Sequence, residues 1–493
     1  MSDFAFIDGS IVGVYLLVVM TAGIMVRKYV GKVEDFLLAG REMNLYLGIA
    51  SLAATEFGIL TCMYTSQNGY ENGFAGAIPG VLLCMAMLFV GWTGFCIKPL
   101  RDSNAITIPE LLEKKYGSRV RWATGVVIAL GGLLNMGVAL RIGGEFLVGV
   151  AGIDQKYLEI MMTTLLLAVA VYTILGGMLS VLITDFLQFI VMSAGLLITT
   201  LFILHKVGWG TLVNTVQNHH GSGGFNPFRN ENMGWSYVVF NAMLATAGVI
   251  TWQPMIARVL AAKDSKTGQR VYTRTSFFFV ARFLVPGLWG IAALAILSPQ
   301  EIGDNSLLAM PTMIRQLLPA GLLGLLVAAM LAAEMSTDSA YMLTWGSIIY
   351  NDIMAPLRRD NTWSERKGLF WNRTIVALIG VFLLIYGLWY KIEGDAWTYL
   401  CLTGTIYLSS ISVLLVACCY WKRANSWGAA AAIICGAFLP VTTLILQKVG
   451  PWTDWFQKRD TLCGVITYVA VAIAMIIGSY HKPQSRLIVT EAK

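Results

Sequence analysis

The chain has 493 residues, of which 57% are hydrophobic and only 13% are charged, and its formal net charge is +7. Soluble domains average about 25% charged residues, and one soluble core rarely exceeds roughly 250–300 residues. The composition therefore excludes a soluble enzyme, a disordered chain and a secreted disulfide scaffold. It predicts an all-α integral membrane protein whose apolar side chains face lipid.

A helix of about 20 apolar residues crosses the ~30 Å hydrocarbon core of a bilayer. Hydropathy predicts about 13 such spans, in one polytopic membrane domain that covers residues 1–493. In chain order they lie near 7–27, 45–66, 76–97, 121–150, 157–175, 179–204, 235–257, 273–297, 322–352, 372–391, 396–421, 427–447 and 460–480. The first lacks the basic start of a signal peptide, so we expect a retained helix. The polar stretch around 206–234 predicts an ordered surface loop.

The lysines and arginines indicate the orientation of the chain. Most of them follow the first, third, seventh, ninth and eleventh expected spans or lie in the tail 481–493, as Arg27, Lys98 and Lys422 illustrate. The positive-inside rule then places the N-terminus outside and the tail 481–493 in the cytoplasm of a cell membrane. The positive charge thus reflects topology, and we expect a lipid bilayer and no nucleic acid as the partner.

Acidic side chains at membrane depth are costly, so each one needs a reason. Glu56 lies 11 residues into the second expected span, about 16 Å by helix rise and close to the midplane. The run of small residues before it ends in Gly58 and favours a helix break, whose freed carbonyls can coordinate a cation. The alternative is an ordinary close-packed helix in which Glu56 pairs with an arginine.

Two other expected spans carry polar groups suited to Na⁺. The ninth has Glu334, Ser336, Thr337 and Asp338 near its centre, and hydroxyls and carboxylates are hard oxygen ligands; the alternative is hydrogen bonding between helices. The sixth has Asp185 within two turns of its cytoplasmic start. That acid could instead face cytoplasmic water.

Two arginines also lie inside expected spans. Arg141 and Glu145 are four residues apart and can neutralise each other on one helix face, or Arg141 can hold a substrate carboxylate as a bidentate fork. Arg282 lies about 12 Å into its helix by helix rise, so we expect its long side chain to reach the cytoplasmic interface.

Together these stretches resemble the sodium:solute symporter family, which includes the sodium/glucose, proline, pantothenate, choline and sialic acid carriers. The resemblance covers nearly the whole chain. It is carried by residues 36–41, 176–177, 184–188, 253, 258–264 and 333–337. It implies a leucine-transporter-like core of two inverted five-helix repeats, at 45–204 and 235–421, with accessory helices at 7–27 and 427–480.

Carried over by position, the family's common sodium site falls on the carbonyls of Ala54 and Phe57 and on Ala333, Ser336 and Thr337. The acid on the sixth helix, which serves a second sodium site in some members, falls on Asp185.

Other positions bear on the solute. Glu56 stands where proline carriers have an aspartate important for sodium, and the aromatic gate of the sugar carriers falls at Gly248, which makes a sugar doubtful. Glu334 and Asp338 replace commoner apolar neighbours, which indicates a cationic substrate or an altered ion site. Gln253 completes the candidate substrate or coupling residues, with Glu56, Arg141 and Asp338.

The sequence therefore predicts a secondary active symporter that imports a small organic solute with Na⁺ and needs no obligate protein partner. Arg141 favours a carboxylate such as an amino acid or short organic acid. Glu56, Glu334 and Asp338, with nearby aromatic side chains, favour an organic cation instead. A transporter-like sensor and a membrane-embedded enzyme are the rivals from other classes, but no His/Asp/Glu cluster at a membrane face has catalytic spacing. The eight cysteines have no CxxC or metal spacing either.

Overall fold

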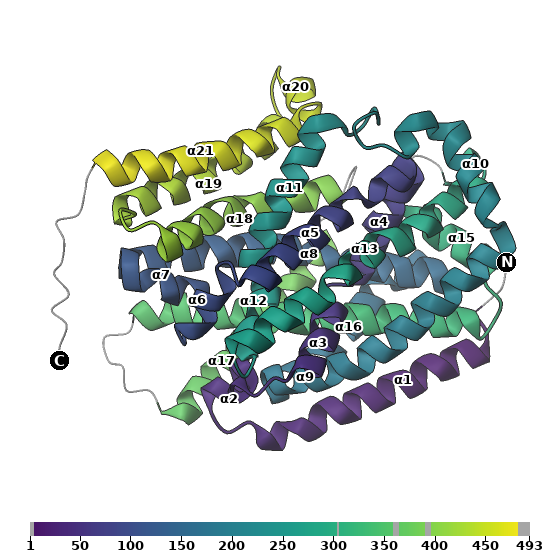
Figure 1. Cartoon of the computed structure of the whole chain (residues 1–493). Coiled ribbons are helices and arrows are strands. Elements are labelled where there is room, and N and C mark those ends of the chain that lie inside the picture. The colour runs from purple at the N-terminus through teal and green to yellow at the C-terminus, as the bar shows by residue number, and fades with distance from the viewer. Residues whose placement is uncertain (1–3, 303–304, 358–363, 390–395, 482–493) are drawn as a thin grey trace.

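The structure, a computed structural model, describes residues 4–302, 305–357, 364–389 and 396–481. Within these ranges it is a bundle of helices that run roughly side by side (Figure 1). The long or broken ones are α1 (Phe6–Met25), α3 (Leu45–Thr55), α4 (Ile59–Asn72), α5 (Ile78–Thr93), α8 (Ser118–Ala151), α9 (Leu158–Val207), α11 (Gly234–Thr251), α12 (Gln253–Ala261), α13 (Ser265–Ile296), α16 (Leu322–Ile348), α17 (Glu365–Trp389), α18 (Ala396–Tyr420), α19 (Ser426–Leu446) and α21 (Asp460–His481). The shorter ones are α2 (Val33–Leu38), α6 (Ile97–Asp102), α7 (Ile108–Tyr116), α10 (Trp209–His220), α14 (Pro299–Ile302), α15 (Ala309–Leu317) and α20 (Thr453–Gln457). Apart from His481, the last residue of α21, the expected tail 481–493 lies outside the described residues.

Eleven stretches of the described chain are long and apolar enough to cross a membrane, and the two longest of these are each divided into two long helical segments. One covers α4 and α5 together, and the other contains the 50 residues of α9, which at 1.5 Å each would reach about 75 Å. Gly177 interrupts α9 with φ 53° and ψ −147°, a conformation that needs glycine. The expected spans 157–175 and 179–204 lie on either side of it. The count of 13 stays a prediction.

One expectation about the connections is wrong. The stretch 206–234 is not a loop throughout, because it contains the 12-residue helix α10. Leu212 and Val216 lie one turn apart on α10 and are fully buried. This helix is too short and too polar to register as a span, but one apolar stripe is enough to dock it on the bundle.

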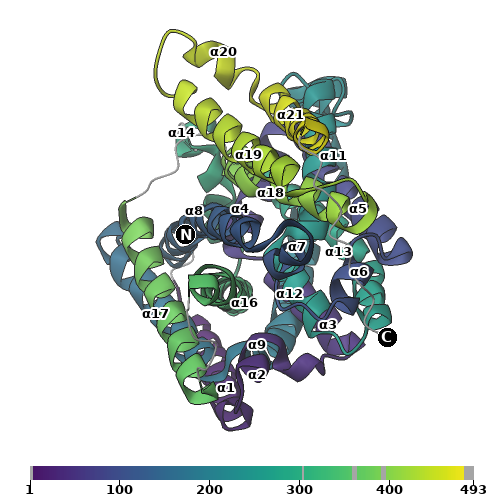
Figure 2. The same ribbon diagram turned by 90° about the vertical axis from the view of Figure 1, so that its left-hand side faces the viewer.

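Helix α16 occupies the middle of the bundle. Figure 2 shows it nearly end-on, and it packs against α1, α3, α8, α9 and α17. Nearly every residue of α16 is buried, including polar ones, while α19 and α21 lie at one edge of the bundle. The polar residues of α16 are thus held in the protein interior, away from lipid.

Helices α4 and α13 touch backbone to backbone. A Cβ atom on Gly69 would lie 2.1 Å from the carbonyl oxygen of Gly287, and one on Gly290 would lie 1.9 Å from that of Ser66. No side chain fits between the helices at these points, so glycine alone permits the contact.

A buried carboxylate fixes α1 to the start of α16. Asp8 is fully buried, and its Oδ1 accepts hydrogen bonds from the backbone N–H groups of Gly321 and Gly324, both at 2.7 Å. These are among the N–H groups that the helix leaves without a partner at its N-terminus. Asp8 therefore caps α16 from another helix.

Replacing Asp8 by Ala should destabilise the protein by about 1–3 kcal/mol, because one buried and one partly buried N–H donor lose their acceptor and the helix loses its cap. We expect a lower midpoint in thermal unfolding of the purified protein. Asp454→Ala, which removes an exposed acid from α20, is the matched control. Equal midpoints for the two variants would show that this cap contributes nothing.

Candidate functional site

The site begins at a break between α3 and α4. Helix α3 ends at Thr55, α4 begins at Ile59, and Gly58 between them has an extended backbone with φ −88° and ψ 173°. At the end of α3 the Phe57 N–H donates to the carbonyl of Ala54 at 3.2 Å. The break predicted from the small-residue run ending in Gly58 is confirmed.

A second break separates α11 from α12. Helix α11 ends at Thr251, and Trp252 has the non-helical backbone angles φ −63° and ψ 112°. The sequence prediction treated 235–257 as one span and missed this break. Pro254 was the available signal, since a helix tends to end at or before the residue that precedes a proline.

The polar centre of α16 lies against the first break. The Thr337 hydroxyl donates to the carbonyls of Thr55 at 2.9 Å and Ala333 at 3.0 Å. Glu334 Oε2 accepts the backbone N–H of Ile59 at 2.8 Å. A Cβ on Gly58 would lie 3.0 Å from the Thr337 hydroxyl oxygen and 3.2 Å from that carboxylate oxygen. The structure thus brings the predicted residues Ala54, Phe57, Ala333 and Thr337 together, and they are buried.

Asp185 and Ser336 form a second polar cluster next to this break. The Ser336 hydroxyl donates to Asp185 Oδ1 at 2.5 Å, and the Ser51 hydroxyl donates to Oδ2 at 2.5 Å. Arg258 of α12 pairs with the same Oδ2 at 3.1 Å and donates to the Thr55 hydroxyl at 2.6 Å. Asp185 and Arg258 are both fully buried, so the alternative of a water-facing acid is wrong. Arg258 belongs to the family motif at 258–264, but its pairing with Asp185 could not be predicted because the two residues lie 73 positions apart.

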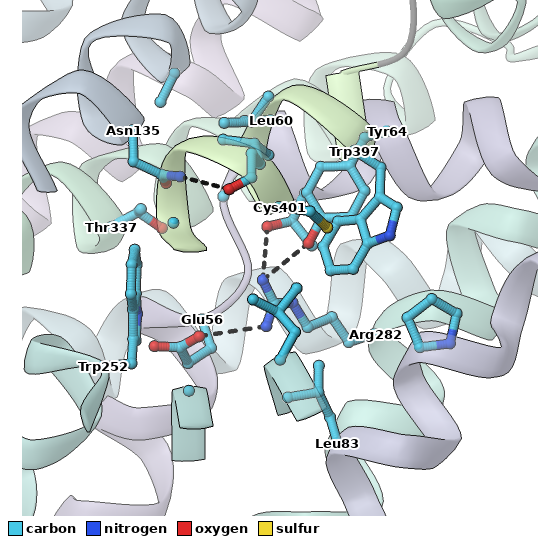
Figure 3. A pocket seen from close by; sticks show the side chains of 18 of the residues that line it. Glu56, Leu60, Tyr64, Leu83, Asn135, Trp252, Arg282, Thr337, Trp397 and Cys401 are labelled. Carbon is cyan, nitrogen blue, oxygen red and sulfur yellow. Dashed lines mark hydrogen bonds and ion pairs between the residues drawn. The ribbon is translucent and has the colours of Figure 1, made fainter. Parts of the chain in front are cut away.

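A cavity of about 130 Å³ opens beside the first break (Figure 3). Helices α4, α8, α11, α13, α16 and α18 contribute to its wall. Its polar and aromatic lining consists of Glu56, Thr61, Tyr64, Asn135, Asn241, Trp252, Arg282, Glu334, Thr337, Tyr341 and Trp397. Thr337 therefore borders both the helix break and the cavity.

Arg282 lies in this cavity and does not reach the cytoplasmic interface, so that expectation is wrong. Its guanidinium pairs with Glu56 at 3.2 Å and donates to the Tyr64 hydroxyl at 3.0 Å, as dashed lines in Figure 3 show. It also donates to the Thr61 hydroxyl at 3.2 Å. The paired carboxylate and two hydroxyls replace the water that the guanidinium would otherwise seek. The helix break and the pairing with an arginine, offered as alternatives for Glu56, therefore occur together.

The other substrate or coupling candidates lie outside the cavity lining. Arg141 pairs with Glu145 at 2.9 Å and donates to the carbonyls of Gly387 and Leu388. Gln253 lines a separate cavity of about 20 Å³. Asp338 is buried one turn beyond Glu334 on α16 but does not line the larger cavity. Of the two alternatives for Arg141, the structure shows the ion pair with Glu145.

A sequence model of the sodium:solute symporter family matches residues 36–436. The chain is 26% identical over 514 residues to the sodium/glucose cotransporter 4 of Danio rerio, covering 95% of this chain and 76% of that protein. It is 26% identical over 526 residues to the sodium/mannose cotransporter SLC5A10 of Bos taurus, covering 96% and 84%. The fold is similar to that of a Na⁺-coupled sialic acid symporter solved in a substrate-bound outward-open state, with a TM-score of 0.82 and 20% identity, covering 98% of this chain and 100% of that one.

Proposed function

Because the chain belongs to the sodium:solute symporter family, we propose that it imports a small organic solute, bound in the 130 Å³ cavity, by coupling its movement to Na⁺. Inward movement of one charge across the membrane releases about 2.3 kcal/mol per 100 mV. That is enough to accumulate a solute without net charge. The observation that carries this proposal is the position of Thr337, which hydrogen-bonds across the helix break and also lines the cavity.

We place Na⁺ between the broken helix and α16. The carbonyls of Ala54, Phe57 and Ala333 and the hydroxyls of Ser336 and Thr337 are the proposed ligands, with Asp185 adding a carboxylate. Hydroxyls that donate a proton to a carbonyl or carboxylate still present lone pairs to a cation. The existing hydrogen bonds of these hydroxyls therefore orient them for an ion and do not exclude one.

For the solute we propose a carboxylate of the amino acid type. The supporting cation is now Arg282 in place of Arg141, because the guanidinium Nε of Arg282 is buried without a partner and the side chain lines the cavity. Guanidinium groups bind carboxylates strongly. An apolar cavity of about 150 Å³ accepts benzene, so the cavity fits a solute of about that size.

A neutral, hydroxyl-rich solute is the second candidate. The relatives named for glucose and mannose favour it, and Asn135, Asn241 and Trp397 supply amide groups and an aromatic face to the cavity. Gly248 argues against it, because the aromatic side chain expected there from the sugar carriers is absent and a Cβ would meet nothing within 4 Å.

Sodium-gradient uptake into proteoliposomes tests the proposal. Ser336→Ala with Thr337→Val should raise the Na⁺ concentration for half-maximal uptake at least about tenfold, equivalent to ~1.4 kcal/mol. Ser10→Ala with Thr374→Val makes the same changes at exposed hydroxyls on α1 and α17 and should leave it unaltered. Equal sodium dependence would contradict the ion assignment. Solute binding without sodium-driven uptake of any solute would contradict symport and favour a sensor.

A further inference from the structure

Glu334 is a buried acid whose carboxylate is only half satisfied. It is fully buried at the centre of α16, and its Oε2 accepts the backbone N–H of Ile59. Its Oε1 has no hydrogen-bond partner, and the residue lines the cavity. A buried polar oxygen without a partner is costly, so its position beside a ligand cavity indicates an acceptor for a ligand.

Two glycines make room for this carboxylate. A Cβ on Gly58 would lie 3.2 Å from Oε2, and one on Gly143 of α8 would lie 3.1 Å from Oε1. The bond from Ile59 also places Oε2 at the N-terminus of α4, where the helix dipole is positive. Two close walls and one backbone donor therefore hold the group in a fixed position.

Glu334 has no cationic partner among the described residues around the cavity. Arg282 already pairs with Glu56, and among the described residues no ion pair involves Glu334. A solute that carried only a carboxylate would add a negative charge to two acids and one arginine. A solute with a cationic nitrogen would instead supply the missing positive charge.

We propose that Oε1 of Glu334 accepts a hydrogen bond from an ammonium group of the transported solute; this rests on the function proposed above and narrows its substrate class. Tyr64, Trp252, Tyr341 and Trp397 line the same cavity, and aromatic faces attract organic cations. These four aromatic faces favour an organic cation over Na⁺, which prefers oxygen ligands. The substrate is therefore an amine, with an amino acid as the form that also uses Arg282.

Ligand-dependent thermal stabilisation of the purified protein at saturating Na⁺ tests this inference. The probes are three matched sets: γ-aminobutyrate, butylamine and butanoate; L-valine, isobutylamine and isovalerate; L-proline, pyrrolidine and cyclopentanecarboxylate. D-Glucose and myo-inositol represent nitrogen-free solutes. We expect stabilisation by ammonium compounds of at least one set and by none of the nitrogen-free ones. Stabilisation by the amine as well as the amino acid would show that the cation alone suffices, and stabilisation by the amino acid alone would show a zwitterion site.

Glu334→Gln keeps an oxygen for the Ile59 N–H and nearly the same volume but removes the charge. It should weaken binding of the ammonium compounds at least tenfold and leave the Na⁺ concentration for half-maximal stabilisation unchanged. Asp352→Asn, at a buried acid in the helical turns 349–354 that follow α16 and outside the cavity lining, is the matched control and should have no such effect. Gly143→Ala, which places a methyl group close to Oε1, should also weaken binding of the ammonium compounds. It keeps the test possible if Glu334→Gln does not fold.

Three results would overturn the ammonium site. They are stabilisation by none of the ammonium compounds, an unaltered affinity for them in both variants, and a loss of Na⁺ affinity with amine binding retained. Sodium-driven uptake of a nitrogen-free solute would overturn it while leaving symport intact. Failure of symport is a separate observation, because the stability measurement does not depend on transport.

Discussion

Replacing Asp185 by Asn should abolish sodium-dependent uptake and destabilise the protein at the same time. The carboxylate is a proposed Na⁺ ligand, and it is also the ion-pair partner of Arg258 in a fully buried position. Removing one partner of a buried pair costs about 3–5 kcal/mol, because the other charge stays buried without compensation. We expect a lower yield of folded protein, a lower unfolding midpoint and a large loss of sodium affinity. Solute affinity should fall too, through reciprocal coupling of the two sites.

A second substitution separates these two effects. Asp185→Asn with Arg258→Gln removes both charges, so it should recover most of the stability but not the sodium dependence. Asp352→Asn breaks the 2.9 Å pair between Asp352, in the helical turns 349–354 after α16, and Arg121 of α8. It should destabilise the protein without changing sodium affinity. Normal sodium-driven uptake in the double variant would reduce Asp185 to a structural ion-pair partner.

Arg282→Gln should raise the KM for a carboxylate-bearing solute about 100-fold or more, equivalent to ~2.7 kcal/mol. The guanidinium supplies the only cationic side chain among the described lining residues of the cavity, and its loss also leaves Glu56 unpaired. Arg282→Lys keeps the charge but loses the planar fork that reaches Thr61 and Tyr64, so it should recover only part of the affinity. Uptake kinetics of the variants in proteoliposomes give these values.

The matched control for this prediction is Arg141→Gln. Arg141 is also a paired, largely buried arginine, but it lies outside the cavity lining, so its loss should leave KM unchanged. Glu56→Gln with Arg282→Gln should restore folding without restoring affinity. An unchanged KM in Arg282→Gln would contradict the role of Arg282. A KM raised only in Arg141→Gln would assign the solute carboxylate to Arg141, as first expected from the sequence.

The sequence predicts the helices well because a membrane span is a local property of 20 consecutive side chains. It also predicts the break at Gly58 from a local run of small residues, and the Arg141–Glu145 pair from their spacing on one helix. It fails where a partner comes from far along the chain. Arg282 has the expected depth in its helix, but Glu56, 226 residues away, decides where its guanidinium points.

The same limit explains the rest of the site. Several polar residues around the helix breaks could be named from their depth in the expected spans, but only the family resemblance joined them into one sodium site, because residues 54–57, 185 and 333–337 lie far apart in the chain. The break at Trp252 could have been predicted from the local sequence, because Pro254 follows it two residues later. The proposed ammonium acceptor, Oε1 of Glu334, could not be predicted from the sequence, because only the three-dimensional structure shows that this oxygen has no hydrogen-bond partner.

The glycine contacts between α4 and α13 determine which parts of this transporter can move against each other. Backbones in direct contact cannot slide without a steric clash, so the two helices form a rigid body that carries Arg282, Thr61 and Tyr64 together. Among the described residues, two polar interactions cross the boundary of that body at the cavity: the ion pair of Arg282 with Glu56 and the hydrogen bond from the Ile59 N–H to Glu334. If α4 and α13 move together during alternating access, the Arg282–Glu56 ion pair and the Ile59–Glu334 hydrogen bond would be strained first. A solute that binds Glu56 and Glu334 would then act directly on the two interactions that resist this movement.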